Sequence, residues 1–282
     1  MSYAGTESTL STFTASDGEN IAVQDWHLPE GVRPRGLVLL VHGLGEHAGR
    51  YDALAGVLND WGFAVRGYDQ YGHGESDGAR GTLPHANRLL DDLADLVESA
   101  RVRKPGLPLI LLGHSLGGLV AASFVARTLL AVDALVLSSP ALATRMTPVQ
   151  KILMAVVPRI APNLTMGNGV DPRYLSHDGQ VVQAYMNDPR VHDRISGRLA
   201  RFIEDEGALV RARAGAWKVP TLLMYAGDDR VVDSAGSQAF SGAAPSAYVS
   251  ARRFDGLYHE IFNEPESQPV YDCLRQWLDG RF

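Results

Sequence analysis

The stretch LILLGHSLGGLVAA, residues 109–122, decides the fold of this chain. Its first four residues form an unbroken apolar run, which is typical of a strand buried on both faces of a parallel sheet. Gly113 and Gly117 leave room for a sharp turn around Ser115, and the small residues after them predict a helix. The pattern therefore predicts a strand, a strained turn and a helix, with the Ser115 side chain raised above the end of the sheet.

Ser115 in this setting is a candidate nucleophile. The helix after it directs free N–H groups at the reacting centre, so the backbone N–H of Leu116 is a candidate donor to an oxyanion. A chance Gly-x-Ser-x-Gly in a loop is the alternative, and the flanking strand and helix signals argue against it. A nucleophilic serine also needs a carboxylate and a histidine, which this architecture carries in the order Ser, Asp, His.

The candidate base is His259, in the glycine-containing loop DGLYH that follows the final predicted strand, residues 248–254. Its position after the final strand distinguishes it from the other histidines. His177 and His192 lie in a polar stretch of the chain, and we expect them to be solvated surface groups.

The carboxylate is expected in AGDDRVVD, residues 226–233, directly after the apolar run TLLMY. Three aspartates compete for the role, namely Asp228, Asp229 and Asp233. Asp233 precedes Ser234 and could simply cap a helix over residues 234–241. Asp228 and Asp229 are neighbours whose side chains point in different directions, so the residues alone separate these candidates poorly.

The block HGLGEH, residues 42–47, ends another apolar strand, residues 37–41. Gly43 and Gly45 let the backbone approach the site and free the N–H of Leu44 as a second oxyanion donor. We interpret His42 as holding this loop by hydrogen bonds. Glu46 and Arg50 could pair with each other or fix the loop in place.

HGLGEH, followed by Arg50 and Tyr51 and then by GHSLGG at residues 113–118, resembles the monoacylglycerol lipase and lysophospholipase branch of the α/β-hydrolases, which are serine aminopeptidase-like. The resemblance covers nearly the whole chain. It implies that Asp229 is the catalytic acid, because in that branch the acid directly precedes the arginine of a stretch like DRVVD. The loop DQYGHGESDG, residues 69–78, resembles the segment that packs beneath the active site in this superfamily, with Gln70 departing from the usual arginine or histidine.

The function implied by this resemblance is a serine esterase that releases fatty acid from monoacylglycerols, or another single-chain lipid ester, through an acyl-enzyme. The catalytic residues would be Ser115, Asp229 and His259, with the oxyanion held by the N–H groups of Leu44 and Leu116. Lysophospholipase, broad carboxylesterase and acyl transfer to an alcohol are the enzymatic alternatives. A fold relative that only binds a hydrophobic ligand is the non-enzymatic alternative, and the intact set of three catalytic residues argues against it.

Strand and helix signals alternate from residue 36 to residue 145, as a mostly parallel sheet flanked by helices requires. A hairpin is predicted over residues 9–28, around the turn at residues 15–18. The alternation stops after residue 140 and resumes at residue 219, with no clear strand between. We therefore expect an α/β-hydrolase core, residues 1–140 and 214–282, and a mainly helical cap insertion, residues 141–213.

The cap begins with apolar residues at helical spacing, which are Ile152, Leu153, Val156, Val157 and Ile160. This stripe could pack on the sheet edge or line an acyl tunnel and touch lipid, and the two readings have equal weight. The rest is polar, with a charged helix predicted over residues 194–212. Its arginines, such as Arg173, Arg190 and Arg194, leave the choice between a glyceride and a lysophospholipid open.

The net charge of −6 and the scattered basic residues exclude a nucleic-acid-binding surface. Residues 1–12 lack the features of a secretory signal, no transmembrane run is present, and Cys273 is the single cysteine. We therefore expect a cytoplasmic protein, with peripheral membrane contact through the cap left open. No metal or cofactor motif is present, so neither is expected, and the sequence does not indicate an oligomeric state.

Overall fold

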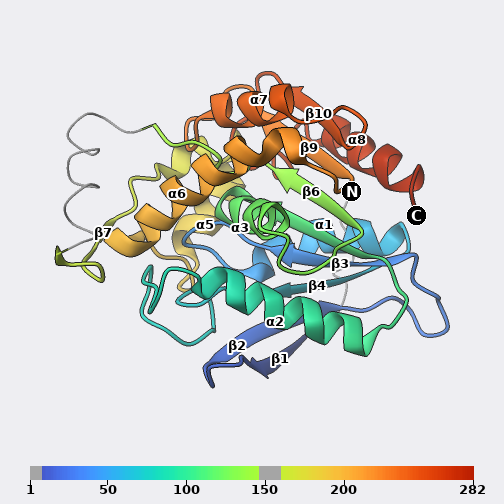
Figure 1. Ribbon diagram of the computed structural model, residues 1–282, viewed down its shortest axis with the longest axis horizontal. Coiled ribbons are helices and arrows are strands. Elements are labelled where there is room, and N and C mark those ends of the chain that lie inside the picture. Colours follow the sequence, from blue (N-terminus) through green and yellow to red (C-terminus); the bar gives the residue numbers. More distant parts are fainter. Residues whose placement is uncertain (1–7, 146–159) are drawn as a thin grey trace.

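The computed structural model describes residues 8–145 and 160–282 (Figure 1). Within these residues eight strands form one sheet in the order β1-β2-β4-β3-β5-β6-β9-β10. The strands are β1 (Ser8–Thr14), β2 (Asn20–Trp26), β3 (Gly36–Val41), β4 (Phe63–Tyr68), β5 (Leu109–His114), β6 (Ala134–Ser138), β9 (Thr221–Ala226) and β10 (Val249–Phe254).

The sheet is mostly parallel, as the sequence predicts. β1 and β2 form the predicted hairpin, in which Thr14 pairs with Asn20, and β2 is antiparallel to β4. From β4 through β3, β5, β6 and β9 to β10, all neighbouring strands are parallel. Their carboxyl ends therefore meet at one edge of the sheet, which is where the candidate site residues lie.

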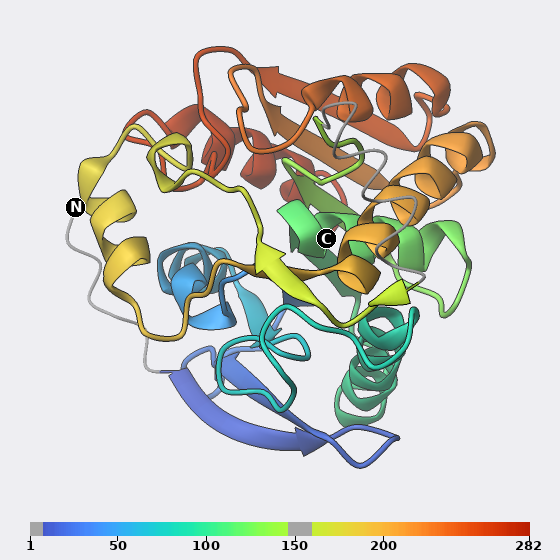
Figure 2. The same cartoon turned by 90° about the vertical axis from the view of Figure 1, so that its left-hand side faces the viewer.

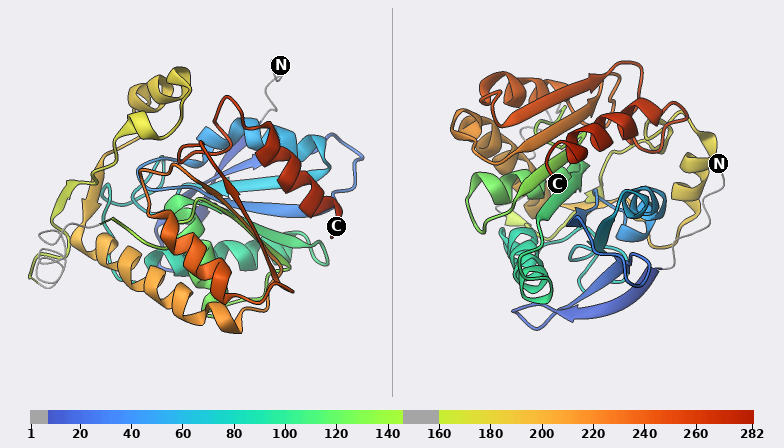
Figure 3. Two further views of the ribbon diagram at one scale, coloured as in Figure 1. Left: turned by 90° about the horizontal axis from the view of Figure 1, so that it is seen from above. Right: turned by 90° about the vertical axis from the view of Figure 1, so that its right-hand side faces the viewer.

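Helices cover both faces of the sheet, and the right panel of Figure 3 shows α1 and α2 on opposite sides. One face packs against α1 and α8, and the other packs against α2, α3, α6 and α7. The helices of these layers are α1 (Asp52–Asp60), α2 (Arg88–Arg103), α3 (Ser115–Ala126), α6 (Gly197–Arg213), α7 (Ser234–Ala243) and α8 (Gln268–Asp279).

Successive residues of the central strands belong to different halves of the core. In β3, Leu39 and Val41 pack with α2 and α3, whereas Val38 and Leu40 pack with α1 and α8. Every residue of β3 is buried. Because full burial of one such side chain contributes about 1.5–3 kcal/mol, both faces of the strand must be apolar, which explains the unbroken apolar runs.

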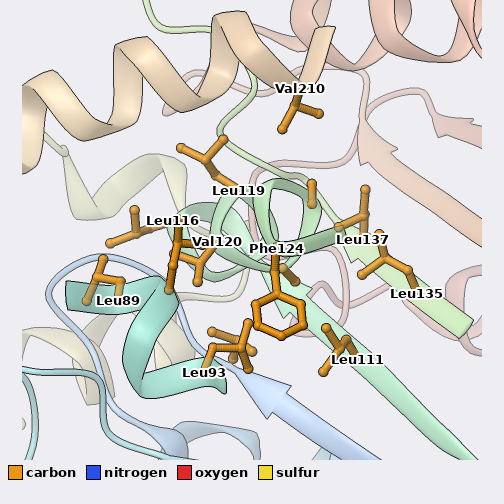
Figure 4. Packing of buried hydrophobic residues seen from close by; sticks show 14 of the residues in the cluster. Leu89, Leu93, Leu111, Leu116, Leu119, Val120, Phe124, Leu135, Leu137 and Val210 are labelled. Carbon is orange, nitrogen blue, oxygen red and sulfur yellow. The ribbon is translucent and has the colours of Figure 1, made fainter. Parts of the chain in front are cut away.

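Helix α3 lies at the centre of the larger half of the core. Its first ten residues, from Ser115 to Phe124, are all buried. Figure 4 shows Leu93 of α2 and Val210 of α6 on different sides of this helix. The sequence predicts this helix from its small and apolar residues, and the structure confirms it.

The inserted segment contains two short strands, β7 (Thr165–Gly167) and β8 (Arg194–Ser196), which pair antiparallel (Figure 2). The expectation of no strand in this stretch is therefore wrong. Three residues are too few to produce a recognisable alternation of apolar and polar side chains. The predicted charged helix begins at Gly197 rather than at residue 194, because residues 194–196 form β8.

The rest of the insertion includes a 3₁₀ turn, η2 (Pro172–Tyr174), and helix α5 (Gly179–Asn187). The left panel of Figure 3 shows α5, in yellow, beyond the ends of the strands. Of the apolar stripe expected here, Ile152, Leu153, Val156 and Val157 lie outside the described residues, and Ile160 is exposed.

Helix α6, although it belongs to the inserted segment, also packs on the core. Its Glu206 is a buried side chain that accepts hydrogen bonds from Ser123 of α3 and, at 2.9 Å, from Nε of Arg127, the residue directly after α3. The division at residues 141–213 stays a prediction. Of the helices in the described ranges, none combines the length and the apolar composition that crossing a membrane requires.

Candidate active site

Ser115 lies at the junction of β5 and α3, with a backbone φ of +53°. Such a value is strained for a residue other than glycine and is often found at active sites. A Cβ on Gly113 would come within 2.4 Å of the Gly117 carbonyl oxygen, and one on Gly117 within 2.1 Å of the Val41 carbonyl oxygen. The turn therefore requires both glycines, and the predicted strand, turn and helix are confirmed.

His259 and Asp229 are joined by a hydrogen bond, in which His259 Nδ1 donates to Asp229 Oδ2 at 2.7 Å. The other oxygen, Oδ1, accepts from the backbone N–H groups of Val231 and Val232, at 2.9 and 3.0 Å. Both side chains are buried. Burial alone would raise the pKa of Asp229, but His259 and these hydrogen bonds outweigh it and hold the pKa below its ordinary value.

The pKa of His259 shifts in the opposite direction. Burial alone would lower it, and the adjacent Asp229 carboxylate raises it above the ordinary value of 6.5. A buried carboxylate bonded to Nδ1 fixes the tautomer, so Nε2 is the nitrogen that can accept a proton. The pair can therefore act as an oriented general base.

The other two candidate aspartates do different things. Asp233 caps α7, because its side chain accepts from the N–H of Ala235 at 3.1 Å, as one reading of the sequence proposed. Asp228 is exposed. Asp229 is thus the aspartate that the structure brings to His259.

The two candidate oxyanion donors flank Ser115. Leu116 is in the first turn of α3, where N–H groups have no acceptor within the helix. The loop that carries Leu44 approaches the serine closely, since a Cβ on Gly43 would lie 3.2 Å from Ser115 Cβ. Both leucines line the same cavity as Ser115.

His42 fixes the orientation of the Leu44 N–H. Its Nε2 accepts from the N–H of Gln70 at 2.9 Å, so the ring proton is on Nδ1, which donates to the Gly43 carbonyl oxygen at 2.7 Å. That carbonyl and the Leu44 N–H belong to one planar peptide unit and point in opposite directions. Holding the carbonyl therefore directs the N–H, and the interpretation of His42 as a loop-holding residue is confirmed.

Glu46, Arg50 and Glu260 form a buried ionic cluster beside the site. Arg50 binds Glu46 and makes two hydrogen bonds to Glu260, at 2.8 and 2.9 Å. Glu46 also accepts from the N–H of Gly43 and from the hydroxyl of Tyr51, both at 2.6 Å. Both expectations for Glu46 and Arg50 are therefore met at once, since they pair with each other and fix the loop.

Sequence reasoning missed Glu260. It is 210 residues away from Arg50 along the chain, and the only signal for it is its position directly after His259. Its side chain also accepts a hydrogen bond from Asn263 Nδ2 at 2.8 Å.

The carboxyl of Glu46 is charged. Burial alone would raise its pKa, but Arg50 and the neighbouring groups lower the pKa to about 2.

His114 packs against the candidate base. The two rings have centroids 4.7 Å apart, and His114 Nδ1 lies 3.1 Å from Ser138 Oγ. Burial, assisted by repulsion from His259, lowers the pKa of His114 to about 4. His114 is therefore neutral at physiological pH and contacts His259 without adding charge.

Ser115 and His259 line one cavity of about 360 Å³. The structure records no hydrogen bond between these two described residues. The evidence that they belong to one site is that both line this cavity. Apolar side chains line much of it, including those of Leu44, Leu116, Met166, Leu175, Ile195, Ile203, Val231 and Val232. The polar lining includes Glu46, Arg50, Glu260 and Tyr185. A volume of this size with a few polar groups suits a small organic ligand.

The expectation that His192 is a solvated surface group is wrong. Its ring packs against that of His73, with centroids 4.8 Å apart, and its backbone N–H donates to the Gly45 carbonyl oxygen at 2.9 Å. His177 is half-exposed, but it stacks on Tyr258 and bonds to Glu264 at 3.0 Å.

Comparison with known proteins agrees with this arrangement. The chain is 36% identical to the monoacylglycerol lipase of Mycolicibacterium smegmatis, over 95% of each chain. It is 32% identical to the phospholipase YtpA of Bacillus subtilis, over 88% of this chain and 96% of that protein. The crystal structure of the Paleococcus ferrophilus monoacylglycerol lipase superposes with a TM-score of 0.80 at 32% identity, covering 98% of this chain and 100% of that one.

The family described as serine aminopeptidase, S33, matches residues 32–266. This range runs from just before β3 to just before α8, so it includes the loop of Leu44, the turn at Ser115 and the loop of His259. With a mostly parallel sheet whose helices lie on both faces, and with relatives aligned over nearly its full length, the chain belongs to the serine aminopeptidase S33 family of α/β-hydrolases.

Proposed function

We propose that this chain is a serine carboxylic-ester hydrolase that releases fatty acid from monoacylglycerols. The observation that carries the proposal is that His259, hydrogen-bonded to Asp229, lines the same cavity as the strained Ser115. Relatives named monoacylglycerol lipase, aligned over nearly the whole chain, support the substrate class. Ser115 is the proposed nucleophile, His259 the base, and Asp229 the residue that orients the base.

In the proposed reaction, Ser115 Oγ attacks the ester carbonyl carbon while His259 Nε2 accepts the hydroxyl proton. Asp229 stabilises the imidazolium that forms, and the N–H groups of Leu44 and Leu116 hold the negative oxygen of the tetrahedral intermediate. His259 then gives its proton to the departing glycerol oxygen, the C–O bond breaks, and the acyl group stays on Ser115. A water molecule deprotonated by His259 releases the fatty acid and restores the Ser115 hydroxyl.

The polarity of the cavity supports a glyceride. Glu46, Arg50 and Glu260 contribute two carboxylates and one guanidinium to its lining, so this cluster carries a net negative charge. Glycerol hydroxyls can donate hydrogen bonds to carboxylates, whereas an anionic phosphate would be repelled by them. The apolar remainder of the lining suits an acyl chain.

The cap arginines do not oppose this conclusion. Arg173, Arg190 and Arg194 pair with Asp171, Asp188 and Asp193, at 2.6, 3.0 and 3.4 Å respectively. The described lining of the cavity does not include any of these three arginines. They therefore do not build a phosphate pocket.

Lysophospholipid hydrolysis is the second candidate, and one observation favours it. Arg145 and Arg230 do line the cavity. Arg145 donates to the Asp229 carbonyl oxygen at 3.0 Å, and the Arg230 guanidinium lies 5.1 Å from the centre of the Tyr174 ring. The Bacillus subtilis relative named a phospholipase agrees with this alternative.

We also propose that residues 141–213 form the cap over the cavity and that the cap touches lipid surfaces. Three large apolar side chains support this contact, since Ile160, Leu164 and Met166 are 76%, 58% and 43% exposed. Met166 also lines the cavity. An acyl chain could therefore pass from a lipid surface to Ser115 along apolar side chains.

The test is the rate of fatty-acid release from 1-oleoylglycerol and from a matched oleoyl lysophosphatidylcholine, with Ser115→Ala as the blank for both. Preference for the glyceride is the expected result. Preference for the lysophospholipid would transfer the assignment to the second candidate. Release from neither substrate, or release that survives in Ser115→Ala, would refute the proposal.

A further inference from the structure

The linker between α5 and β8, residues 188–193, contacts the loop that carries Leu44, residues 42–47, which we call the oxyanion loop. The backbone N–H of His192 donates to the Gly45 carbonyl oxygen at 2.9 Å. Asp188 Oδ2 lies 2.9 Å from His47 Nε2. The insertion therefore binds the oxyanion loop at two points, one on each side of Glu46.

The bond from His47 has one possible direction. His47 Nδ1 accepts from the N–H of Gly49 at 3.1 Å, so the ring proton is on Nε2 and is donated to Asp188. The His47 side chain is 1% exposed, so its ring cannot turn toward water instead. A buried N–H without an acceptor costs about 1–3 kcal/mol, which makes Asp188 an obligatory partner.

Asp188 is itself held in place. Its Oδ1 accepts from the backbone N–H of Arg190 at 2.9 Å, and the Arg190 guanidinium binds Oδ2 at 3.0 Å. Asp188 also forms the C-terminal boundary of α5. The carboxylate thus connects the end of a cap helix to a buried side chain of the oxyanion loop.

The linker also packs directly on Gly45. This glycine has a φ of +77°, and a Cβ on it would come within 2.3 Å of the His192 carbonyl oxygen. The loop therefore lies between two supports. His42 holds the Gly43–Leu44 peptide from the core, and the linker holds Gly45 and His47 from the insertion.

We infer that Asp188 is a positioning residue for the oxyanion hole, which couples the placement of the cap to the alignment of the Leu44 N–H. The inference rests on the proposed function, because that alignment matters only if Ser115 attacks a carbonyl. Acylation and deacylation both pass through an oxyanion at the same site. Loss of the coupling should therefore lower kcat whichever of the two steps limits the rate.

The chain offers a matched control, because the sequence Asp-Pro-Arg occurs twice in the insertion, at residues 171–173 and 188–190. In both copies the aspartate accepts from the N–H of the arginine and binds its guanidinium. Asp188 alone of the two is bonded to His47. Asp171→Ala therefore removes the same local turn without touching the oxyanion loop.

The experiment measures kcat and KM for a 4-nitrophenyl ester with the wild type, Asp188→Ala, Asp188→Asn and Asp171→Ala. Asp188→Ala should lower kcat by about 10- to 100-fold with KM changed by less than about threefold, because misplacing one oxyanion donor by about 1 Å costs up to that much. Asp188→Asn should recover only part of the loss, because its single oxygen can replace one of the two carboxylate oxygens that accept from His47 and from the Arg190 N–H. Asp171→Ala should stay within about twofold of the wild type.

Hydrogen exchange of residues 43–49 gives a readout that does not need turnover. Asp188→Ala should speed exchange in this segment, and Asp171→Ala should leave it unchanged. An inactive wild type would refute the proposed function. An active wild type with unchanged kcat in Asp188→Ala, or with equal exchange in the two alanine variants, would overturn the positioning role alone.

Discussion

Replacing Arg50 by methionine removes a guanidinium that binds both Glu46 and Glu260. The side chains of the two glutamates are 4% and 5% exposed and that of Arg50 is 11% exposed, so the cluster is buried. Exposed ion pairs contribute only about 0–1 kcal/mol, whereas removing one partner from a buried pair costs about 3–5 kcal/mol. We therefore expect Arg50→Met to lower the free energy of unfolding by about 3–5 kcal/mol at neutral pH.

The loss should depend on pH with a defined sign. In the native protein the pKa of Glu46 is lowered to about 2 from its ordinary 4.5, because Arg50 and the neighbouring groups outweigh burial. A group with a lowered folded-state pKa contributes stability above pH 4.5 and loses it as the pH falls toward 2. Without Arg50, burial remains the largest influence on Glu46, so the pKa of this carboxyl rises. The charged carboxylate then destabilises the fold, and protonation relieves the effect.

The assay is urea unfolding followed by tryptophan fluorescence, at about pH 5 and about pH 8. The deficit of Arg50→Met should be larger at the higher pH. Arg201→Met is the control, because Arg201 and Asp205 are also paired four residues apart, here on helix α6, but are 48% and 53% exposed. It should lose no more than about 0.5 kcal/mol. A deficit below about 1 kcal/mol in Arg50→Met, or an equal deficit at both pH values, would refute the reasoning.

The remaining predictions concern the site and its surroundings. Asp229→Asn should lower kcat by about 10⁴-fold in steady-state kinetics, because the amide no longer holds His259 in the tautomer whose Nε2 accepts a proton. In the wild type, the acid limb of the pH profile of kcat/KM should lie above pH 6.5, because His259 must be neutral to act as a base and Asp229 raises its pKa. In Asp229→Asn this limb should move to lower pH. A limb that does not move would contradict the assignment of Asp229. Gly43→Ala should lower kcat about tenfold or more, since the new methyl group would lie 2.8 Å from Glu46 Oε1 and 3.2 Å from Ser115 Cβ. Steady-state kinetics with a 4-nitrophenyl ester measure this effect. An unchanged kcat would mean that the loop moves to make room for the methyl group without loss of function. Leu164→Glu with Met166→Glu should weaken co-sedimentation with anionic lipid vesicles, while equal sedimentation would argue against lipid contact through the cap.

Local patterns of the sequence predict the parts of this fold that depend on local chemistry. The apolar run at residues 109–112 and the glycines around Ser115 predict the turn, because a buried strand and a tight turn each have a signature within a few residues, even though the carbonyl that excludes a side chain at Gly117 belongs to Val41 of β3. His259 follows from its place after the last strand. The choice of Asp229 as the acid rests on the family resemblance, because three aspartates lie within six residues of sequence. The turn at Val231 and Val232, which is visible only in the structure, determines which of them faces the histidine.

What the sequence does not predict depends on residues that are far apart in the chain. Glu260 meets Arg50 across 210 residues, and Asp188 meets His47 across 141. A pattern of apolar and polar residues within a short stretch of sequence does not indicate contacts between residues so far apart. His192 lies in a polar stretch that looks solvated, yet its ring is covered by His73 from a different loop.

The burial of α3 on all sides has a consequence for how the protein folds. A helix without a polar face gains little from forming alone in water, because most of its stability comes from packing against other elements. Its neighbours are strands and helices spread over the chain, from Leu39 of β3 to Val210 of α6. The strained turn at Ser115 cannot persist before they close around it. During refolding, the appearance of esterase activity should therefore coincide with the last step of core assembly, and a fragment that lacks α6 should not react with a serine-directed probe.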